Sequence, residues 1–188
     1  MSHPRTMPTR TLTLGALLLA LGLALPALVH MVGMGRVLLP MHLPILLAGF
    51  VVGPGMAALL GVVTPLLSAV LTGMPALIPP VAQAMAVELA VYGFVTGVLY
   101  RHTRWHVIPC LVAAMVTGRL GYGVIGFLVL PLLGLPQVAL FYPLTYALVT
   151  GLPGIASQLV LVPGLVYLVE RYSGTSLRAN RHRQAAAK

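Results

Sequence analysis

The stretch TLTLGALLLALGLALPALVHMV, residues 11–32, contains no Asp, Glu, Lys or Arg. A transmembrane helix needs about 20 mostly apolar residues to cross roughly 30 Å of hydrocarbon. Stretches of similar character follow at residues 37–52, 56–71, 81–100, 107–130 and 141–168. Their apolar runs are continuous and do not alternate with period two, which favours helices over a barrel. We therefore predict an all-α membrane protein with six transmembrane helices.

The composition agrees with a chain whose solvent is lipid. Of its 188 residues, 59% are hydrophobic and 7% are charged, whereas a typical soluble domain is about 25% charged. Only two residues, Glu88 and Glu170, are acidic. The length leaves room for one domain with short loops. We expect an N-terminal segment at residues 1–10, a membrane domain at 11–170 and a basic tail at 171–188.

The net charge of +9 is concentrated outside the predicted spans. Basic residues precede the first span, occupy the short loop at 101–106 and follow the last span. This is the positive-inside pattern, and it predicts that both termini are cytoplasmic and that anionic lipid, not nucleic acid, is the contact. The basic start and first apolar run imitate a secretory signal, but further spans follow at once, so we expect an uncleaved first helix. The basic residues that form the positive-inside pattern are Arg5, Arg10, Arg101, Arg104, Arg171, Arg178, Arg181, Arg183 and Lys188.

Glu88 and Arg119 are the charged residues within the six predicted spans. Each is costly in hydrocarbon unless it is paired or faces a cavity. Two interpretations remain open: a structural ion pair between them, or a site reached from outside that one or both of them line. Tyr92 follows Glu88 by four residues and Tyr122 follows Arg119 by three, so each tyrosine shares a helix face with its charged neighbour.

Weaker polar signals lie on other spans. Thr64, Ser68 and Thr72 share one stripe, and Thr150 and Gln158 share roughly one face of the last span. Hydroxyl groups in apolar helices often bond their own backbone instead of a ligand.

His42, near the outer end of the second span, is a candidate hydrogen-bonding group in an outward-facing pocket. His30 and His42 are twelve residues apart, which is not a metal-ligand spacing. The single Cys110 excludes an internal disulfide and a cysteine-based metal cluster. We expect no metal and no cofactor.

Motifs of common enzymes are absent from the sequence. There is no GxxxxGK[ST] loop, no HExxH helix and no GxSxG elbow. Two acidic residues leave little scope for paired-carboxylate catalysis. We therefore expect that the chain is not an enzyme.

A stripe of small residues follows the first span, where Ala16, Ala20 and Ala24 are spaced four apart. Helices in lipid associate through close approach of such faces. The stripe either packs within this chain or docks onto another membrane subunit.

Together these segments resemble the substrate-binding S component of an energy-coupling factor (ECF) vitamin transporter. The resemblance covers about residues 11–170. It rests on the AxxxA pattern of the first helix, on LPILLAGF at residues 43–50 leading into Gly53-Pro54, on Gly61, and on ELAVYG at 88–93 followed by GVLY at 97–100.

The resemblance implies a prokaryotic cell-membrane protein that captures a micronutrient with high affinity from outside. It then associates with a coupling transmembrane subunit and two cytoplasmic ATPases, and topples to release its substrate inside. The alanine stripe would dock onto the coupling subunit. Loops at residues 33–39, 72–80 and 132–137 would cap the pocket. Mapped onto this sequence, the pocket candidates are His42, Thr72, Met74, Gln83, Glu88, Tyr92, Arg119, Tyr122 and Gln158.

The ligand stays open at this point. Arg119 could hold a carboxylate, as pantothenate or folate would present, whereas Met-rich outer ends could suit cobalamin. A self-sufficient secondary carrier or channel is an alternative function. A third is an assembly or anchoring protein with a closed interior.

Overall fold

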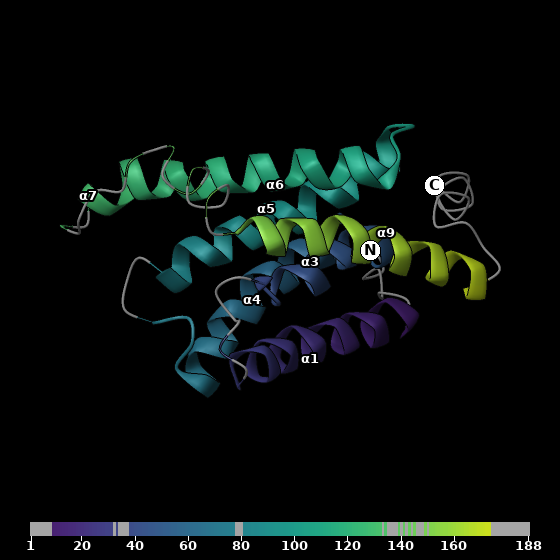
Figure 1. The fold of residues 1–188 in the computed structure, drawn as a ribbon, viewed down its shortest axis with the longest axis horizontal. Coiled ribbons are helices and arrows are strands. Elements are labelled where there is room, and N and C mark those ends of the chain that lie inside the picture. Colours follow the sequence, from purple (N-terminus) through teal and green to yellow (C-terminus); the bar gives the residue numbers. More distant parts are fainter. Residues whose placement is uncertain are drawn as a thin grey trace, which may run out of the picture.

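The computed structural model describes residues 9–31, 33, 38–77, 81–132, 134, 139, 141, 143, 145, 149 and 151–173. Within these ranges every regular element is a helix, and the long helices form one bundle (Figure 1). They are α1 (Thr9–Met31), α3 (His42–Val51), α4 (Pro54–Thr72), α5 (Val81–His102), α6 (Val107–Val124), the π-helix η1 (Ile125–Val129), α7 (Leu130–Leu132) and α9 (Leu152–Ser173).

Five of the described helices are long and apolar enough to cross a membrane: α1, α4, α5, the continuous run Val107–Leu132 and α9. The predicted spans at 11–32, 56–71, 81–100 and 107–130 match the first four of these within two residues at each end. The all-helical membrane architecture is thereby confirmed.

The second predicted span corresponds to a shorter helix. Helix α3 has ten residues, which is about 15 Å at 1.5 Å per residue and roughly half the hydrocarbon thickness. The sixth predicted span began at residue 141, but α9 begins at Leu152. Most of residues 133–150, Thr150 among them, lie outside the described residues.

The glycines and prolines of the sequence predict a tight turn at Gly53-Pro54-Gly55 and a break from Pro131 to Pro136, and the structure corrects both. The connection between α3 and α4 consists of Val52 and Gly53, which has φ +99°, because α4 already begins at Pro54. Proline fits the first helical turn, since its missing N–H would have no partner there. Pro131, expected to start a break, lies inside α7.

The exposed arginines of the described residues lie at one end of the bundle. Figure 1 shows that the start of α1, the end of α5 and the end of α9 lie at the same end. The ends of α1 and α4 lie at the opposite one. The exposed basic side chains on those three helix ends and the adjoining α5–α6 loop are Arg10, His102, Arg104, His106 and Arg171.

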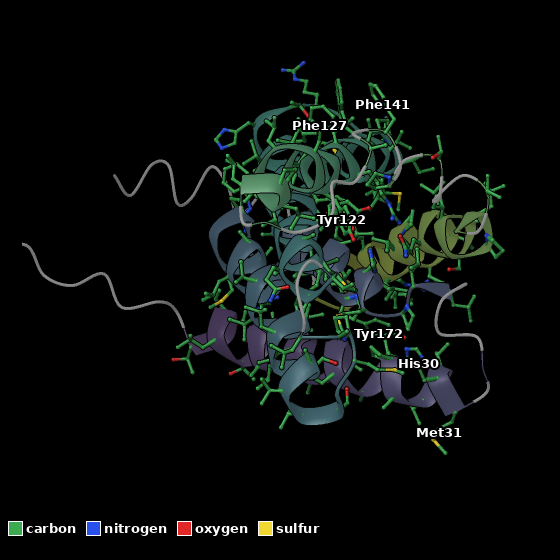
Figure 2. The ribbon with its side chains drawn as sticks, turned by 90° about the vertical axis from the view of Figure 1, so that its left-hand side faces the viewer. His30, Met31, Tyr122, Phe127, Phe141 and Tyr172 are labelled. Carbon is green, nitrogen blue, oxygen red and sulfur yellow. The ribbon has the colours of Figure 1, made fainter. Side chains whose placement is uncertain are left out.

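The outer surface is apolar, as lipid requires. Met31 is 84% exposed and Leu132 85% exposed. Figure 2 shows Met31 and Phe127 pointing away from the bundle.

Helix α5 occupies the centre, packed between α3, α4 and α6. Its neighbours approach closely because glycines line the contacts. A Cβ on Gly61 would lie 2.5 Å from the backbone of Leu89, and one on Gly93 would lie 2.6 Å from the carbonyl oxygen of Ala57. Close backbone approach through small residues is the usual way in which membrane helices associate.

We expect Gly61→Ala to destabilise the bundle by about 1–3 kcal/mol, because the added methyl overlaps the α5 backbone. Gly55→Ala is the matched control on the same helix, since a Cβ there would meet no atom within 4 Å beyond its chain neighbours and its own helix backbone. Thermal unfolding in detergent measures both. Equal melting temperatures for the two variants would contradict the close α4–α5 contact.

Candidate functional site

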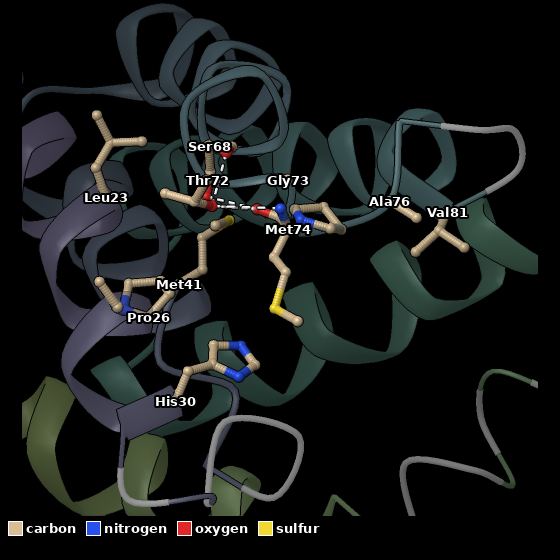
Figure 3. A pocket seen from close by; sticks show the side chains of 12 residues that line it. Leu23, Pro26, His30, Met41, Ser68, Thr72, Gly73, Met74, Ala76 and Val81 are labelled. Carbon is tan, nitrogen blue, oxygen red and sulfur yellow. Dashed lines mark hydrogen bonds between the residues drawn. The ribbon is translucent and has the colours of Figure 1, made fainter.

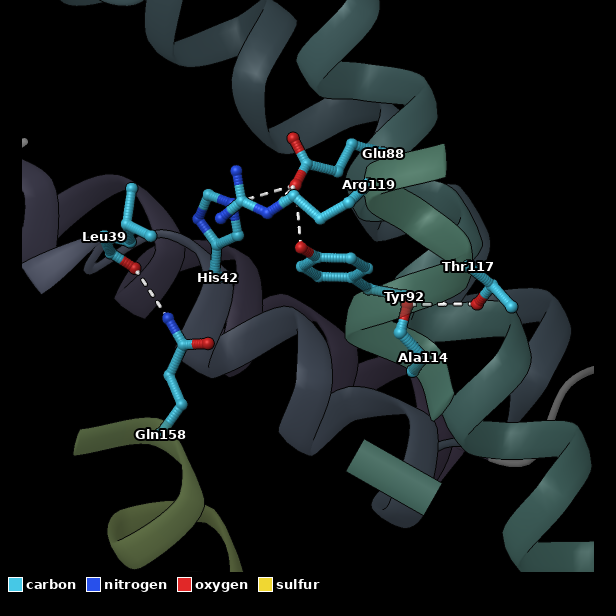
Figure 4. A network of polar contacts seen from close by, with 8 residues as sticks. All are labelled: Leu39, His42, Glu88, Tyr92, Ala114, Thr117, Arg119 and Gln158. Carbon is cyan, nitrogen blue, oxygen red and sulfur yellow. Dashed lines mark hydrogen bonds and ion pairs between the residues drawn. The ribbon is translucent and has the colours of Figure 1, made fainter. Parts of the chain in front are cut away.

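A polar cluster of four residues lies inside the bundle: His42 at the start of α3, Glu88 and Tyr92 on α5, and Arg119 on α6 (Figure 4). The Nε atom of Arg119 lies 3.0 Å from Oε1 of Glu88. The hydroxyl of Tyr92 donates a hydrogen bond of 2.7 Å to the same oxygen. The Glu88 and Arg119 side chains are only 4% and 11% exposed, so their charges neutralise each other away from water.

The sequence explains why these residues meet. Glu88 and Tyr92 are one turn apart on α5 and therefore share a face. Gly118, next to Arg119 on α6, packs against the Tyr92 ring and the Glu88 carbonyl. A side chain at position 118 would push the helices apart, so this glycine permits the ion pair.

His42 has a different environment from its neighbours. It is 3% exposed, and its ring centroid lies 5.5 Å from that of Tyr92. Its Nε2 atom is 3.9 Å from Oε1 of Glu88, which is too far for a hydrogen bond. Neither ring nitrogen has a hydrogen-bond partner among the described residues. A buried polar group without a partner costs about 1–3 kcal/mol, so these nitrogens are available to bond a further group.

A cavity of about 450 Å³ lies where α1 and α4 end (Figure 3). Figure 1 shows that these helix ends lie opposite the end that carries the exposed arginines. The last turns of α1 and α4, residues 73–76 and Met41 form its walls. The lining is mostly apolar. Its hydroxyls are engaged already, because Ser68 donates to the Met74 carbonyl at 2.7 Å and Thr72 to the Ser68 carbonyl at 2.8 Å.

The structure distributes the nine pocket candidates over separate places. His42, Glu88, Tyr92 and Arg119 form the polar cluster, whereas Thr72 and Met74 line the cavity. Met41 connects the two places in sequence, since it lines the cavity and precedes His42.

The remaining three candidates lie outside both places. Gln83 is exposed and donates to the Leu77 carbonyl at 2.9 Å, which holds the segment between α4 and α5. Gln158 is buried and donates to the Leu39 carbonyl at 3.4 Å. Tyr122 is half-buried on α6, beyond Arg119.

One polar contact was not predicted from the sequence. The Tyr100 hydroxyl donates to Oε1 of Glu170 at 3.1 Å, and the Tyr100 ring meets Phe50 edge-on at 4.9 Å. This contact joins α5 to α9 near the end that carries the cations. Seventy residues separate the two partners, and no local spacing indicates such a pair.

The alanine stripe faces outward. Ala16, Ala20 and Ala24 are exposed, while Gly15, Leu18, Gly22 and Pro26 turn toward the bundle. The stripe therefore does not pack within the described part of this chain.

The sequence model of one protein family, the ECF transporter substrate-specific component, matches residues 10–166. The chain belongs to this family. No curated protein and no solved structure matches it. ECF S components are transporter subunits and not enzymes, and in general they work with a transmembrane coupling subunit and ATPases. Together with its membrane-spanning helices, membership makes this S component a multi-pass membrane protein.

For the buried pair, we expect Arg119→Met to cost about 3–5 kcal/mol of stability, because it leaves the Glu88 charge uncompensated. Glu88→Gln combined with Arg119→Met removes both charges and should cost less than the sum of the two single changes. A double-mutant cycle by thermal unfolding measures this. Additive losses would contradict a direct ion pair.

Proposed function

We propose that this S component captures a water-soluble vitamin or related micronutrient with high affinity, for ATP-driven uptake. One observation supports the proposal: the cavity lies at the end of the bundle opposite the exposed arginines. Cations favour the cytoplasmic side. The cavity then opens outward, where a nutrient would enter.

The same argument supports a complete topology. The segment containing α3 would count as a sixth span, and both termini would lie in the cytoplasm of a prokaryotic cell. The segments at 1–10 and 171–188 would then be cytoplasmic. The residues after α4, which line the cavity from Gly73 to Ala76, would act as one of its caps.

The size of the cavity bears on the substrate. Small-molecule sites commonly enclose about 300–1,000 Å³ and combine apolar walls with a few polar groups. A cavity of about 450 Å³ lies in the lower part of that range. Of the pantothenate, folate and cobalamin classes, it favours a molecule the size of pantothenate over the much larger cobalamin.

The partners would be a coupling transmembrane subunit and two cytoplasmic ATPases. The exposed face of Ala16, Ala20 and Ala24 is a suitable docking surface, because small side chains let a second helix approach its backbone.

We expect the purified S component alone to bind a vitamin, with about 2.7 kcal/mol of added stability at a ligand concentration 100 times the Kd. Thermal shift with a vitamin panel measures this. Ala27→Phe fills the cavity wall and should weaken binding at least tenfold, whereas Ala16→Phe, off the cavity on the same helix, should not. If no vitamin shifts the melting temperature, the proposal fails. Flux into liposomes without ATPases would favour the carrier or channel alternative.

For docking, we expect Ala20→Leu to reduce complex formation with the coupling module at least tenfold, because the larger side chain blocks close helix approach. Vitamin binding by the isolated chain should not change. Ala156→Leu on α9 is the matched control, since that alanine is also exposed. Co-purification with the coupling subunit and ATPases measures the effect. Equal yields for both variants would exclude the stripe as the docking surface.

A further inference from the structure

Among the described residues, the ring nitrogens of His42 have no hydrogen-bond partner, and few charged side chains face the ring. Glu88 and Tyr92 face it from α5, and Arg119 reaches the same carboxylate from α6. Helix α4 has no ionisable side chain. On α1, His30 is exposed and Arg10 lies at the opposite end. On α9, the charged residues Glu170 and Arg171 are at that opposite end as well. The side chain of Gln158 is neutral, and its amide donates a hydrogen bond to the Leu39 carbonyl.

Counting donors indicates which kind of group the cluster can accept. A guanidinium carries five N–H donors, and contact with one carboxylate uses two of them at most. The Tyr92 hydroxyl already donates its hydrogen to Glu88. Arg119 and His42 therefore retain N–H donors, and the Arg119 side chain is the more exposed member of the ion pair, at 11% against 4%. A ligand that supplies acceptor oxygens, above all a carboxylate, fits this surplus.

Counting charges adds a second condition. Glu88 and Arg119 sum to zero, so a carboxylate entering beside them leaves one uncompensated negative charge in a buried place. An unpaired buried charge is strongly unfavourable. Histidine is the side chain that gains a proton most readily between about pH 5 and 8. Neither ring nitrogen of His42 has a hydrogen-bond partner among the described residues, so the nitrogen that carries no hydrogen can take up the proton.

We infer that the substrate of this S component is a carboxylic acid that occupies the cavity and extends past Met41, so that its carboxylate is held between Arg119 and His42, and that His42 takes up one proton from water as the acid binds. This deepens the proposed function and rests on it. The protonated imidazole then donates to the ligand carboxylate and faces Glu88, whose Oε1 is 3.9 Å from Nε2. Binding is strongest at low pH and weakens as the pH rises, because the complex contains one more proton and the proton concentration falls.

The test begins with full-length protein in detergent and five probes: pantothenate, biotin and folate as acids, riboflavin as a neutral compound and thiamine as a cation. We expect an acid to bind. Its uncharged counterpart, pantothenol for pantothenate or biotinamide for biotin, should bind about 10- to 100-fold more weakly. Binding of riboflavin or thiamine alone overturns the inference but leaves the proposed function standing. Binding of no probe overturns both.

Proton uptake is measured on the wild-type chain by titration calorimetry in two buffers of different ionisation enthalpy. We expect uptake to approach one proton per bound acid above neutral pH, with Kd rising up to about tenfold per pH unit. His42→Gln should remove this slope, and His102→Gln, an exposed histidine at the end of the bundle opposite the cavity, should keep it. No proton uptake by the wild type overturns the inference, even if His42→Gln fails to fold. So does a slope that survives His42→Gln.

Discussion

The contact between the Glu88 carboxylate and the Arg119 guanidinium is the constraint on which the interior of this S component depends. Two opposite charges in a bundle surrounded by hydrocarbon have to meet, since neither can reach water. Their meeting fixes the distance and the rotation of α5 against α6. Tyr92 can then bond the same carboxylate oxygen, and Gly118 has to stay small for the helices to come close.

A pair of this kind contributes little net stability, because the cost of removing both charges from water offsets much of their attraction. Apolar packing would hold α5 and α6 together at least as well. The pair instead provides charged donor and acceptor groups at a fixed position inside an apolar bundle. His42, with two ring nitrogens unbonded among the described residues, lies beside that place.

Much of the architecture could be predicted from the sequence, because hydropathy over about 20 residues follows directly from the thickness of a membrane. The ends of α4, α5 and the Val107–Leu132 run were predicted within two residues. The length of α3 was not, because apolar residues continue before His42 and composition alone does not locate a helix start. The site was predicted only in part. Helical spacing linked Glu88 to Tyr92, and an ion pair between Glu88 and Arg119 was one of the two interpretations that the sequence left open. The sequence could not decide between them, because pairing between helices depends on tertiary packing, as does the Tyr100–Glu170 contact. The cavity wall formed by Leu23, Pro26 and His30 was not predicted either, because nothing distinguishes lining residues from lipid-facing ones in an apolar helix.

Helix α1 is attached differently from the rest of the bundle. Within the described residues, no side chain of α1 hydrogen-bonds to another helix, and its inward face is built from Gly15, Leu18, Gly22 and Pro26. Sideways sliding of α1 would therefore break no polar contact. This helix carries the alanine stripe on its outer face, and Leu23, Pro26, Ala27 and His30 of the same helix line the cavity. A partner subunit that binds the alanine stripe and displaces α1 would therefore also change the shape of the cavity.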